Sequence, residues 1–281
     1  MWEYHVYTDT TKFINLGYWK NANSLDEAGK ELARFVFCWS LLGRLVAQVG
    51  EMNFGDDVLD CGFGFGDQDF FWFDEFQPSS ITGVNIMTDQ VNFARQKALR
   101  LRVDDRVKFM YCSATELDLE FKEPKFDLVI ALESAFHFYK REDFFKAAFK
   151  VLRPGGRIVL ADLVPGKPLE KMNFFEKALE LFKLSLWCNP IENEYVADVY
   201  QKKMEDIGFA QVKISDISDE VLEPLRNFGR SRLTDPVFLQ RFNFFHRNRL
   251  VQEAAFSVIS HGPPFPTRHY IIAQAKKPNE N

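Results

Sequence analysis

A histidine and an aspartate follow two strand-like segments of this 281-residue chain. His137 comes after the apolar run in ALESAFHF, and Asp162 ends the apolar run in VLADL. If both runs are parallel strands of one sheet, both side chains lie at its carboxyl edge, where open α/β sheets bind ligands. An imidazole there can take a proton, and a nearby carboxylate can fix its tautomer and favour its cation. The pair predicts general-base chemistry; a pocket-wall histidine and a helix-capping aspartate are the plainer interpretation.

A glycine-rich loop comes before these residues. Gly62, Gly64 and Gly66 alternate with phenylalanines after Asp60, in VLDCGFGFGDQ. The dinucleotide fingerprint GxGxxG would need glycine at the position of Asp67. Because carboxylates on both sides repel a pyrophosphate, the loop favours a ligand with a cationic part and no phosphate. S-adenosylmethionine meets this requirement through its ammonium and sulfonium groups, and a tight strand-to-helix turn without a ligand is the alternative.

The elements that must hold these residues alternate along the middle of the chain. Short apolar runs with sharp stops predict strands, and runs with helical spacing predict helices between them. Such alternation is typical of an α/β fold, a parallel sheet with helices on both faces, and the last two strands could add an antiparallel edge. The predicted strands cover 56–62, 79–86, 106–114, 125–134, 157–164, 210–218 and 268–277. One predicted helix covers 88–102, with a Thr cap, and another lies in the stretch 141–156, where Pro154 and the glycines after it end it.

Two regions do not follow the alternation. The N-terminal part contains the aromatic segment FINLGYW and then a helix from about Ser24, and two later parts read as helices rich in Phe, Leu and Trp. We expect these pieces to pack over the carboxyl ends of the strands. The expected organisation is one domain over 1–281, with an N-terminal lid and helix at 1–45, a cofactor-binding core at 46–165, and the remaining core strands with helical substrate-cap insertions at 166–281.

Five stretches in the right order carry a resemblance to a known family. They are NLGYW, VLDCGFGFGDQ, ITGVNIMTDQVNFAR, FDLVIALESAFHF and LRPGGRIVLADL. With them the chain resembles the class I S-adenosylmethionine-dependent methyltransferases. It is most similar to the small-molecule branch with antibiotic sugar O-methyltransferases, rifamycin-type O-methyltransferases, and sterol and tocopherol C-methyltransferases. The resemblance implies a Rossmann-like, doubly wound, seven-stranded and mostly parallel sheet, and S-adenosyl-L-methionine as the cofactor.

The resemblance also implies cofactor contacts, with two departures from the usual pattern. Asn85 stands where most of the class has an acidic residue for the ribose, with Gln90 as a helper. The usual aspartate for the adenine amine is missing from the stretch CSAT. Each of these residues also has a plainer interpretation as a turn, cap or packing residue. The implied cofactor-binding residues are Tyr18, Asp60, Gly62, Gly64, Gly66, Asn85, Gln90, Ser113, Ala114, Thr115 and Glu133.

The chemistry at His137 depends on the acceptor. A sugar or alkyl hydroxyl needs a base, whereas an amine or thiolate acceptor can do without one. In the antibiotic sugar O-methyltransferases that the chain resembles, a histidine and an aspartate at the places of His137 and Asp162 act as base and partner. We expect an O-methyltransferase for a bulky, partly apolar small molecule, because the cap sequences NFFEKALELFKLSLW and FLQRFNFFHRN are aromatic. The alternatives are N-, S- or C-methyl transfer, or a cofactor-binding protein without methyl transfer.

Composition excludes several other classes. The net charge of −5 gives no reason to expect a nucleic acid or an anionic membrane as a partner, and the apolar runs are too short to cross a bilayer. The four cysteines are widely spaced and no group of residues has metal-ligand spacing, so we expect no metal and a reducing cytoplasm. The expected partner is a small-molecule methyl acceptor, and a homo-oligomer is left open.

Overall fold

The predicted α/β sheet is confirmed by the computed structural model, which describes residues 15–20, 22–24, 27–36, 55–187, 189–232 and 268–279. Seven strands form one sheet in the order β3-β2-β1-β4-β5-β7-β6. The strands are β1 (Asp57–Cys61), β2 (Ser80–Asn85), β3 (Val107–Tyr111), β4 (Phe126–Leu132), β5 (Leu152–Pro165), β6 (Ala210–Asp216) and β7 (Arg268–Lys276).

The strand order reverses beside β1, which pairs in parallel with β2 on one side and β4 on the other. In doubly wound sheets a ligand binds at the carboxyl ends of the strands where the order reverses. β7 is antiparallel to both of its neighbours, β5 and β6. The expected antiparallel edge is therefore confirmed, and β7 lies inside it with β6 at the margin.

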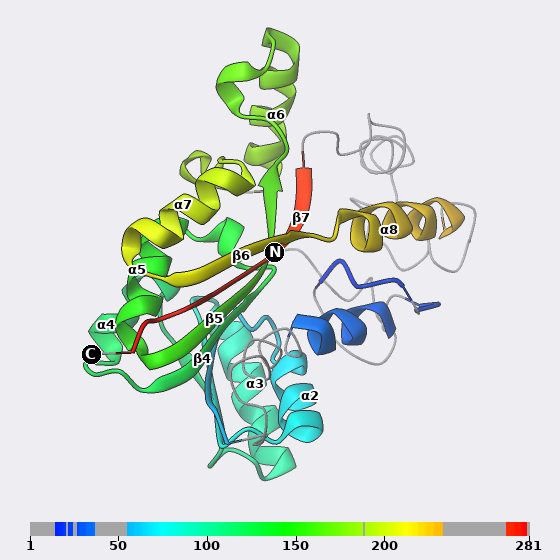
Figure 1. Ribbon diagram of the computed structural model, residues 1–281. Helices are drawn as coiled ribbons and strands as arrows, with labels where there is room; N and C mark the ends of the chain where they lie inside the picture. Colours follow the sequence, from blue (N-terminus) through cyan, green and yellow to red (C-terminus); the bar gives the residue numbers. More distant parts are fainter. Residues whose placement is uncertain are drawn as a thin grey trace.

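Helices cover both faces of the sheet (Figure 1). One core cluster joins the sheet to the helix at 27–36 and to α2, α3 and α8. The other joins the opposite face to α4, α5 and α7. Two apolar faces in one sheet explain why the central strands read as continuous apolar runs. The helices are α2 (Asp67–Phe76), α3 (Thr88–Leu101), α4 (Leu117–Glu120), α5 (Arg141–Val151), α6 (Phe174–Trp187), α7 (Ala197–Ile207) and α8 (Ser218–Arg232).

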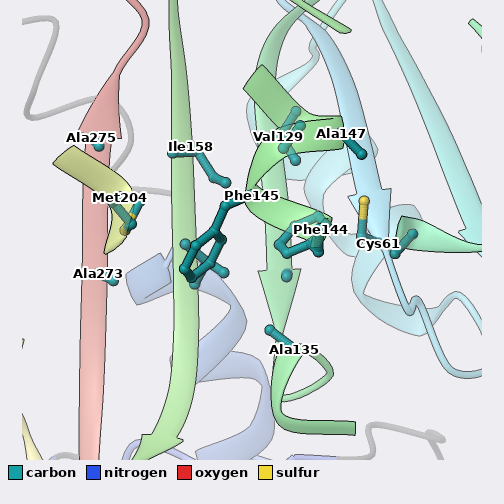
Figure 2. Packing of buried hydrophobic residues seen from close by; sticks show 14 of the residues in the cluster. Cys61, Val129, Ala135, Phe144, Phe145, Ala147, Ile158, Met204, Ala273 and Ala275 are labelled. Atoms are coloured by element: carbon teal, nitrogen blue, oxygen red, sulfur yellow. The ribbon is translucent and has the colours of Figure 1, made fainter. Parts of the chain in front are cut away.

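Helix α5 is fixed to the sheet by two successive phenylalanines. Phe144 and Phe145 are fully buried, and Figure 2 shows them against Val129 and Ile158 of the sheet. Phe145 also contacts the ring of Tyr200 in α7, with 5.1 Å between the ring centroids. This packing holds α5 against the sheet. The helix begins at Arg141, shortly after the turn that follows β4.

The helix predicted in 141–156, which Pro154 is expected to end, stops a little earlier. α5 ends at Val151, and β5 already begins at Leu152. Lys125 N donates to Val151 O at 2.8 Å, and Gly155 N donates to Lys277 O at 3.0 Å, so backbone pairing holds this stretch extended. Pro154 disfavours helical backbone in the residue before it. The strand therefore takes the residues that helical spacing assigned to the helix.

The starts of two helices can be compared with the prediction from the sequence. The hydroxyl of Ser24 accepts the N–H of Glu27, which confirms the helix expected from about Ser24. The expected Thr cap of α3 is wrong, because Met87 is the N-cap residue and Thr88 is the first helical residue.

The second aromatic sequence predicted to form the substrate cap, FLQRFNFFHRN, lies outside the described residues. Among the described helices, none is long and apolar enough to cross a membrane.

Candidate functional site

The glycine loop connects β1 to α2 at the point where the strand order reverses. Its three glycines have positive φ: Gly62 at 89°, Gly64 at 59° and Gly66 at 81°. A β-carbon on Gly62 would lie 2.4 Å from Cβ of Ser134, and one on Gly66 would lie 2.9 Å from Phe109. Gly62 and Gly66 are therefore required both by the packing around them and by the positive φ of the turn. Gly64 is required by its positive φ.

Asp60 lies beneath this loop and is fully buried. Its Oδ2 accepts a hydrogen bond from Gln68 at 2.6 Å, and burial raises its pKa to about 7. Asp69 is also fully buried, and burial together with the nearby Asp60 charge raises the pKa of Asp69 well above its usual range. Two neighbouring buried carboxyl groups disfavour each other's ionisation, so the pair resists losing both of its protons.

The second carboxylate that flanks the loop behaves differently. Asp67 forms an ion pair with Lys97 of α3 at 2.7 Å. The charge expected to repel a phosphate at this position is thus largely neutralised, and the buried carboxyl pair of Asp60 and Asp69 remains under the loop. Sequence reasoning missed the second member of that pair, because Asp69 reads as an ordinary acidic residue in the first turn of a helix.

The predicted ribose pair comes together at the end of β2. Asn85 Nδ2 donates to Gln90 Oε1 at 2.8 Å, and Asn85 Oδ1 accepts from Met87 N at 3.0 Å. Sequence reasoning also missed Ile86 and Met87, which directly follow Asn85 and are 60% and 51% exposed. Large apolar side chains this exposed at a ligand edge provide a surface on which a flat ring can lie.

The predicted adenine residues lie at the neighbouring strand end. Cys112 N donates to Asn85 O at 3.2 Å, which ties the segment after β3 to the end of β2. The hydroxyls of Ser113 and Thr115 are 2.8 Å apart, and Ser113 caps a short 3-10 helix, η2 (Ala114–Glu116). Ala114 is buried. These residues make a compact turn beside the ribose pair.

Glu133 directly follows β4 and has a left-handed backbone, with φ at 51°. Its Oε1 accepts the N–H of Leu16 at 2.8 Å and the hydroxyl of Tyr270 at 2.7 Å. Burial raises the pKa of Glu133 to about 7, and the nearby charge of Asp162 adds to the rise. A non-glycine residue in this conformation is strained, and such strain often occurs at functional sites.

The N-terminal segment reaches this edge through Leu16 and its neighbours. Tyr18 N donates to Ala28 O at 2.9 Å, and the Tyr18 ring stacks on Phe35 at 4.5 Å between centroids. The Tyr18 ring is thus held by the helix at 27–36, while Leu16 is held by Glu133. The structure brings the segment to the carboxyl edge of β4.

His137 ends the 3-10 turn η3 (Ala135–His137) that follows β4. The residue keeps an exposed edge, but packing around its ring displaces enough water to lower its pKa. The nearby Asn189 side chain opposes this shift. The lowered pKa favours the neutral imidazole, which is the form that can accept a proton.

Asp162 has other partners than His137. It is fully buried in β5, where Oδ2 lies 2.9 Å from Nε of Arg141 and accepts the Tyr200 hydroxyl at 3.1 Å. Its Oδ1 accepts the N–H of Leu163 at 2.9 Å. Across the part of the chain that the structure describes, no hydrogen bond or ion pair joins His137 to Asp162.

These groups together can bind and orient a cationic ligand and accept a proton. The loop and its buried carboxyl pair, the Asn85 amide group and the carboxylate of Glu133 surround the carboxyl ends of β1, β2 and β4. Within the described ranges, no group of three His, Cys, Asp or Glu residues could hold a metal ion.

Comparisons with known proteins point in one direction. Residues 59–160 match the family model of a methyltransferase domain. Erythromycin 3''-O-methyltransferase of Saccharopolyspora erythraea is 34% identical over 277 residues, which cover 98% of this chain and 86% of that protein.

Solved structures share the fold. The cyclase SpnF superposes with a TM-score of 0.70 at 19% identity, over 95% of this chain and 89% of that one. A geranyl diphosphate methyltransferase in complex with SAM superposes with a TM-score of 0.63 at 21% identity, over 90% and 87% of the two chains. At these identities the likeness concerns the fold alone.

Proposed function

The chain belongs to the family of S-adenosylmethionine-dependent small-molecule methyltransferases, and we propose that it methylates a hydroxyl oxygen of a bulky, partly apolar molecule. The observation that carries this proposal is the place of His137 in the turn that follows β4, where the Ser134 hydroxyl of the same turn donates to Cys61 O beside the glycine loop at 2.5 Å. The similarity to an enzyme named as a sugar O-methyltransferase, over nearly the whole chain, supports the choice of oxygen.

The cofactor is S-adenosyl-L-methionine, which supplies an activated methyl group on a cationic sulfur. The residues at the loop fit it, because a buried carboxyl pair favours a cation nearby. Among the described residues, no N–H group donates to the buried Oδ1 of Asp60. We assign the ribose to Asn85 and Gln90. The adenine ring would lie between the exposed Ile86 and Met87 and the turn at 113–115.

His137 would act on the acceptor hydroxyl. Methyl transfer is an in-line displacement, so the protein's main contributions are to orient the acceptor and to exclude water. As the new bond forms, the hydroxyl becomes acidic and its proton needs a base. The lowered pKa of His137 favours the neutral ring, one of whose nitrogens can take that proton.

The acceptor's bulk is inferred from α6. This helix stands beyond the carboxyl end of β5 (Figure 1). Phe174 and Phe175 are 79% and 82% exposed, and Phe182 is also largely exposed. An apolar surface of this kind, next to the edge that holds His137, suits an acceptor with a large apolar part.

The proposal also covers the cellular location and the assembly of the protein. The buried cysteines Cys61 and Cys112 are free thiols, which is the usual state in a reducing compartment, so we place the enzyme in the cytoplasm. A homo-oligomer is compatible with the exposed face of α6, and size-exclusion chromatography with light scattering would measure its size.

Production of S-adenosylhomocysteine from a panel of hydroxyl, amine and thiol acceptors tests the proposed function. Turnover restricted to hydroxyl acceptors is the expected result. His137→Ala should lower kcat by about 10²–10⁴ while leaving calorimetric affinity for S-adenosylhomocysteine within about twofold. Preference for an amine or thiol acceptor, with near-normal turnover by His137→Ala, would replace O-methyl transfer by N- or S-methyl transfer.

A further inference from the structure

The turn that carries His137 is clamped from outside by one buried side chain. Asn193, at the end of the 3-10 turn η5 (Ile191–Asn193), is fully enclosed. Its Nδ2 donates to Phe138 O at 2.6 Å and to Phe136 O at 3.2 Å. These are the carbonyl groups on either side of His137. One amide group therefore fixes the backbone on both sides of the imidazole.

Asn193 is in turn held by the first residue of α5. Its Oδ1 accepts the backbone N–H of Arg141 at 2.7 Å, and its backbone oxygen accepts from Nη1 of Arg141 at 2.9 Å. The Arg141 guanidinium is buried 5.0 Å from the ring centroids of both Tyr195 and Tyr200. Its Nε lies 2.9 Å from the carboxylate of Asp162. The contacts run without interruption from Asp162 through Arg141 and Asn193 to the turn.

We propose that Asn193 is the positioning residue for His137, and that Asp162 acts on the imidazole only through Arg141 and Asn193. This inference rests on the proposed function, in which His137 is the base. It gives Asp162 a role in the reaction without a direct contact between the two side chains.

The turn needs such support because it has little of its own. Its internal backbone bonds are the two from His137 N to Ser134 O at 3.0 Å and from Phe138 N to Ala135 O at 3.3 Å. A short 3-10 turn has poor hydrogen-bond geometry and is easily displaced. A shift of about 1 Å at a reacting group can cost about 10² in rate.

Asparagine suits this place because it has two N–H donors and one acceptor in a single rigid group. The carboxylate introduced by Asn193→Asp would present an oxygen to two carbonyl oxygens and lose both donated bonds, at almost unchanged volume. The variant therefore tests the donors and not the packing.

The experiment is a double-mutant cycle on the full chain, with a hydroxyl acceptor that the panel assay described above identifies. Asn193→Asp and Asn193→Ala should lower kcat about 10- to 100-fold with the affinity for S-adenosylhomocysteine within about threefold. In the His137→Ala background the same substitutions should lower kcat by less than about twofold, because they act through His137. Asp56→Asn, which removes the buried partner of Arg157 at the opposite edge of the sheet, is the matched control for a loss of stability alone.

Each outcome decides a different point. An equal loss from Asn193→Asp with and without His137 would overturn the positioning role while leaving the base intact. Unchanged kcat in Asn193→Asp, measured on protein with a normal circular dichroism spectrum, would overturn it too. If Asp56→Asn lowers Tm and kcat together, in the same proportion as the Asn193 variants do, the Asn193 effect is one of stability. Near-normal turnover by His137→Ala would remove the base, and the inference with it.

Discussion

The carboxylate of Glu133 holds the backbone of Leu16, a residue 117 positions earlier in the chain, by a 2.8 Å hydrogen bond from Leu16 N to Oε1. The same oxygen accepts the hydroxyl of Tyr270 in β7. One oxygen atom thus joins the N-terminal segment, the end of β4 and the antiparallel strand. Because the end of β4 borders the glycine loop, this contact couples the N-terminal segment to the cofactor edge.

Glu133→Ala should release the N-terminal segment. A hydrogen bond contributes about 0.5–1.5 kcal/mol net, so exchange of the Leu16 amide should accelerate by about two- to tenfold. The Trp19 amide, which donates to Glu220 O, is the internal control and should change less. Hydrogen exchange followed by mass spectrometry or NMR measures both.

We further expect cofactor to slow hydrogen exchange across residues 15–20 in the wild type. An unchanged exchange pattern would rule out a lid that orders on cofactor binding.

Glu133 should also make stability depend on pH near neutrality. Its pKa is raised to about 7 in the folded chain from an ordinary value near 4.5. The stabilising effect of the protonated form is fully present below about pH 4.5 and is lost as pH rises through about 7. Glu133→Gln keeps an acceptor oxygen but does not titrate. The Tm difference, variant minus wild type, should therefore be larger at pH 8.5 than at pH 5, and a constant difference would contradict the shift.

Gly64→Val should abolish cofactor binding with a modest effect on folding. The position has a positive φ of 59°, which strains a β-branched residue, and its loop lies at the cofactor edge. Isothermal calorimetry with S-adenosylhomocysteine should show no heat, whereas Gly208→Ala, at the C-cap of α7, strains a similar backbone far from the loop and should bind normally. Normal affinity of Gly64→Val would move the cofactor away from this loop.

The sequence predicted much of this edge because its signals are local. The strand end at Asn85, its partner Gln90 five positions later and the glycine loop can be read from neighbouring residues, and the structure brings them together. The partners of Asp162 could not be predicted in this way. Arg141 comes from α5 and Tyr200 from α7, and only the folded sheet brings them to β5. A strand-end aspartate therefore looked like a partner of the nearest histidine.

Asn193 escaped prediction for a related reason. It lies in NPIENEY, a polar, proline-containing stretch that is typical of a surface loop. Its near-complete burial follows from contacts with residues more than fifty positions away, Phe136, Phe138 and Arg141. No period or motif in one sequence records such contacts.

Asn189→Asp should shift the pH dependence of turnover. The Asn189 amide acts to raise the pKa of His137 against the effect of burial, and a carboxylate in its place would favour the imidazolium more strongly. The rising limb of kcat/KM should move upward by about one pH unit or more, so the variant loses activity at pH 6 and keeps it at pH 9. Asn189→Leu should move the limb the opposite way. Identical profiles in all three proteins would show that another group controls the reaction.

Asp162→Asn should cost stability as well as rate, and a second substitution should separate the two. Removing one partner of a buried ion pair costs about 3–5 kcal/mol, and we expect the lower value because the charge of Glu194 also lies near Arg141. Adding Arg141→Met removes the uncompensated charge and should recover most of the free energy of unfolding, measured by urea denaturation. It should not recover kcat, because Nη1 of Arg141 no longer holds Asn193 beside the His137 turn. Recovery of kcat together with stability would mean that Asp162 and Arg141 only stabilise the fold.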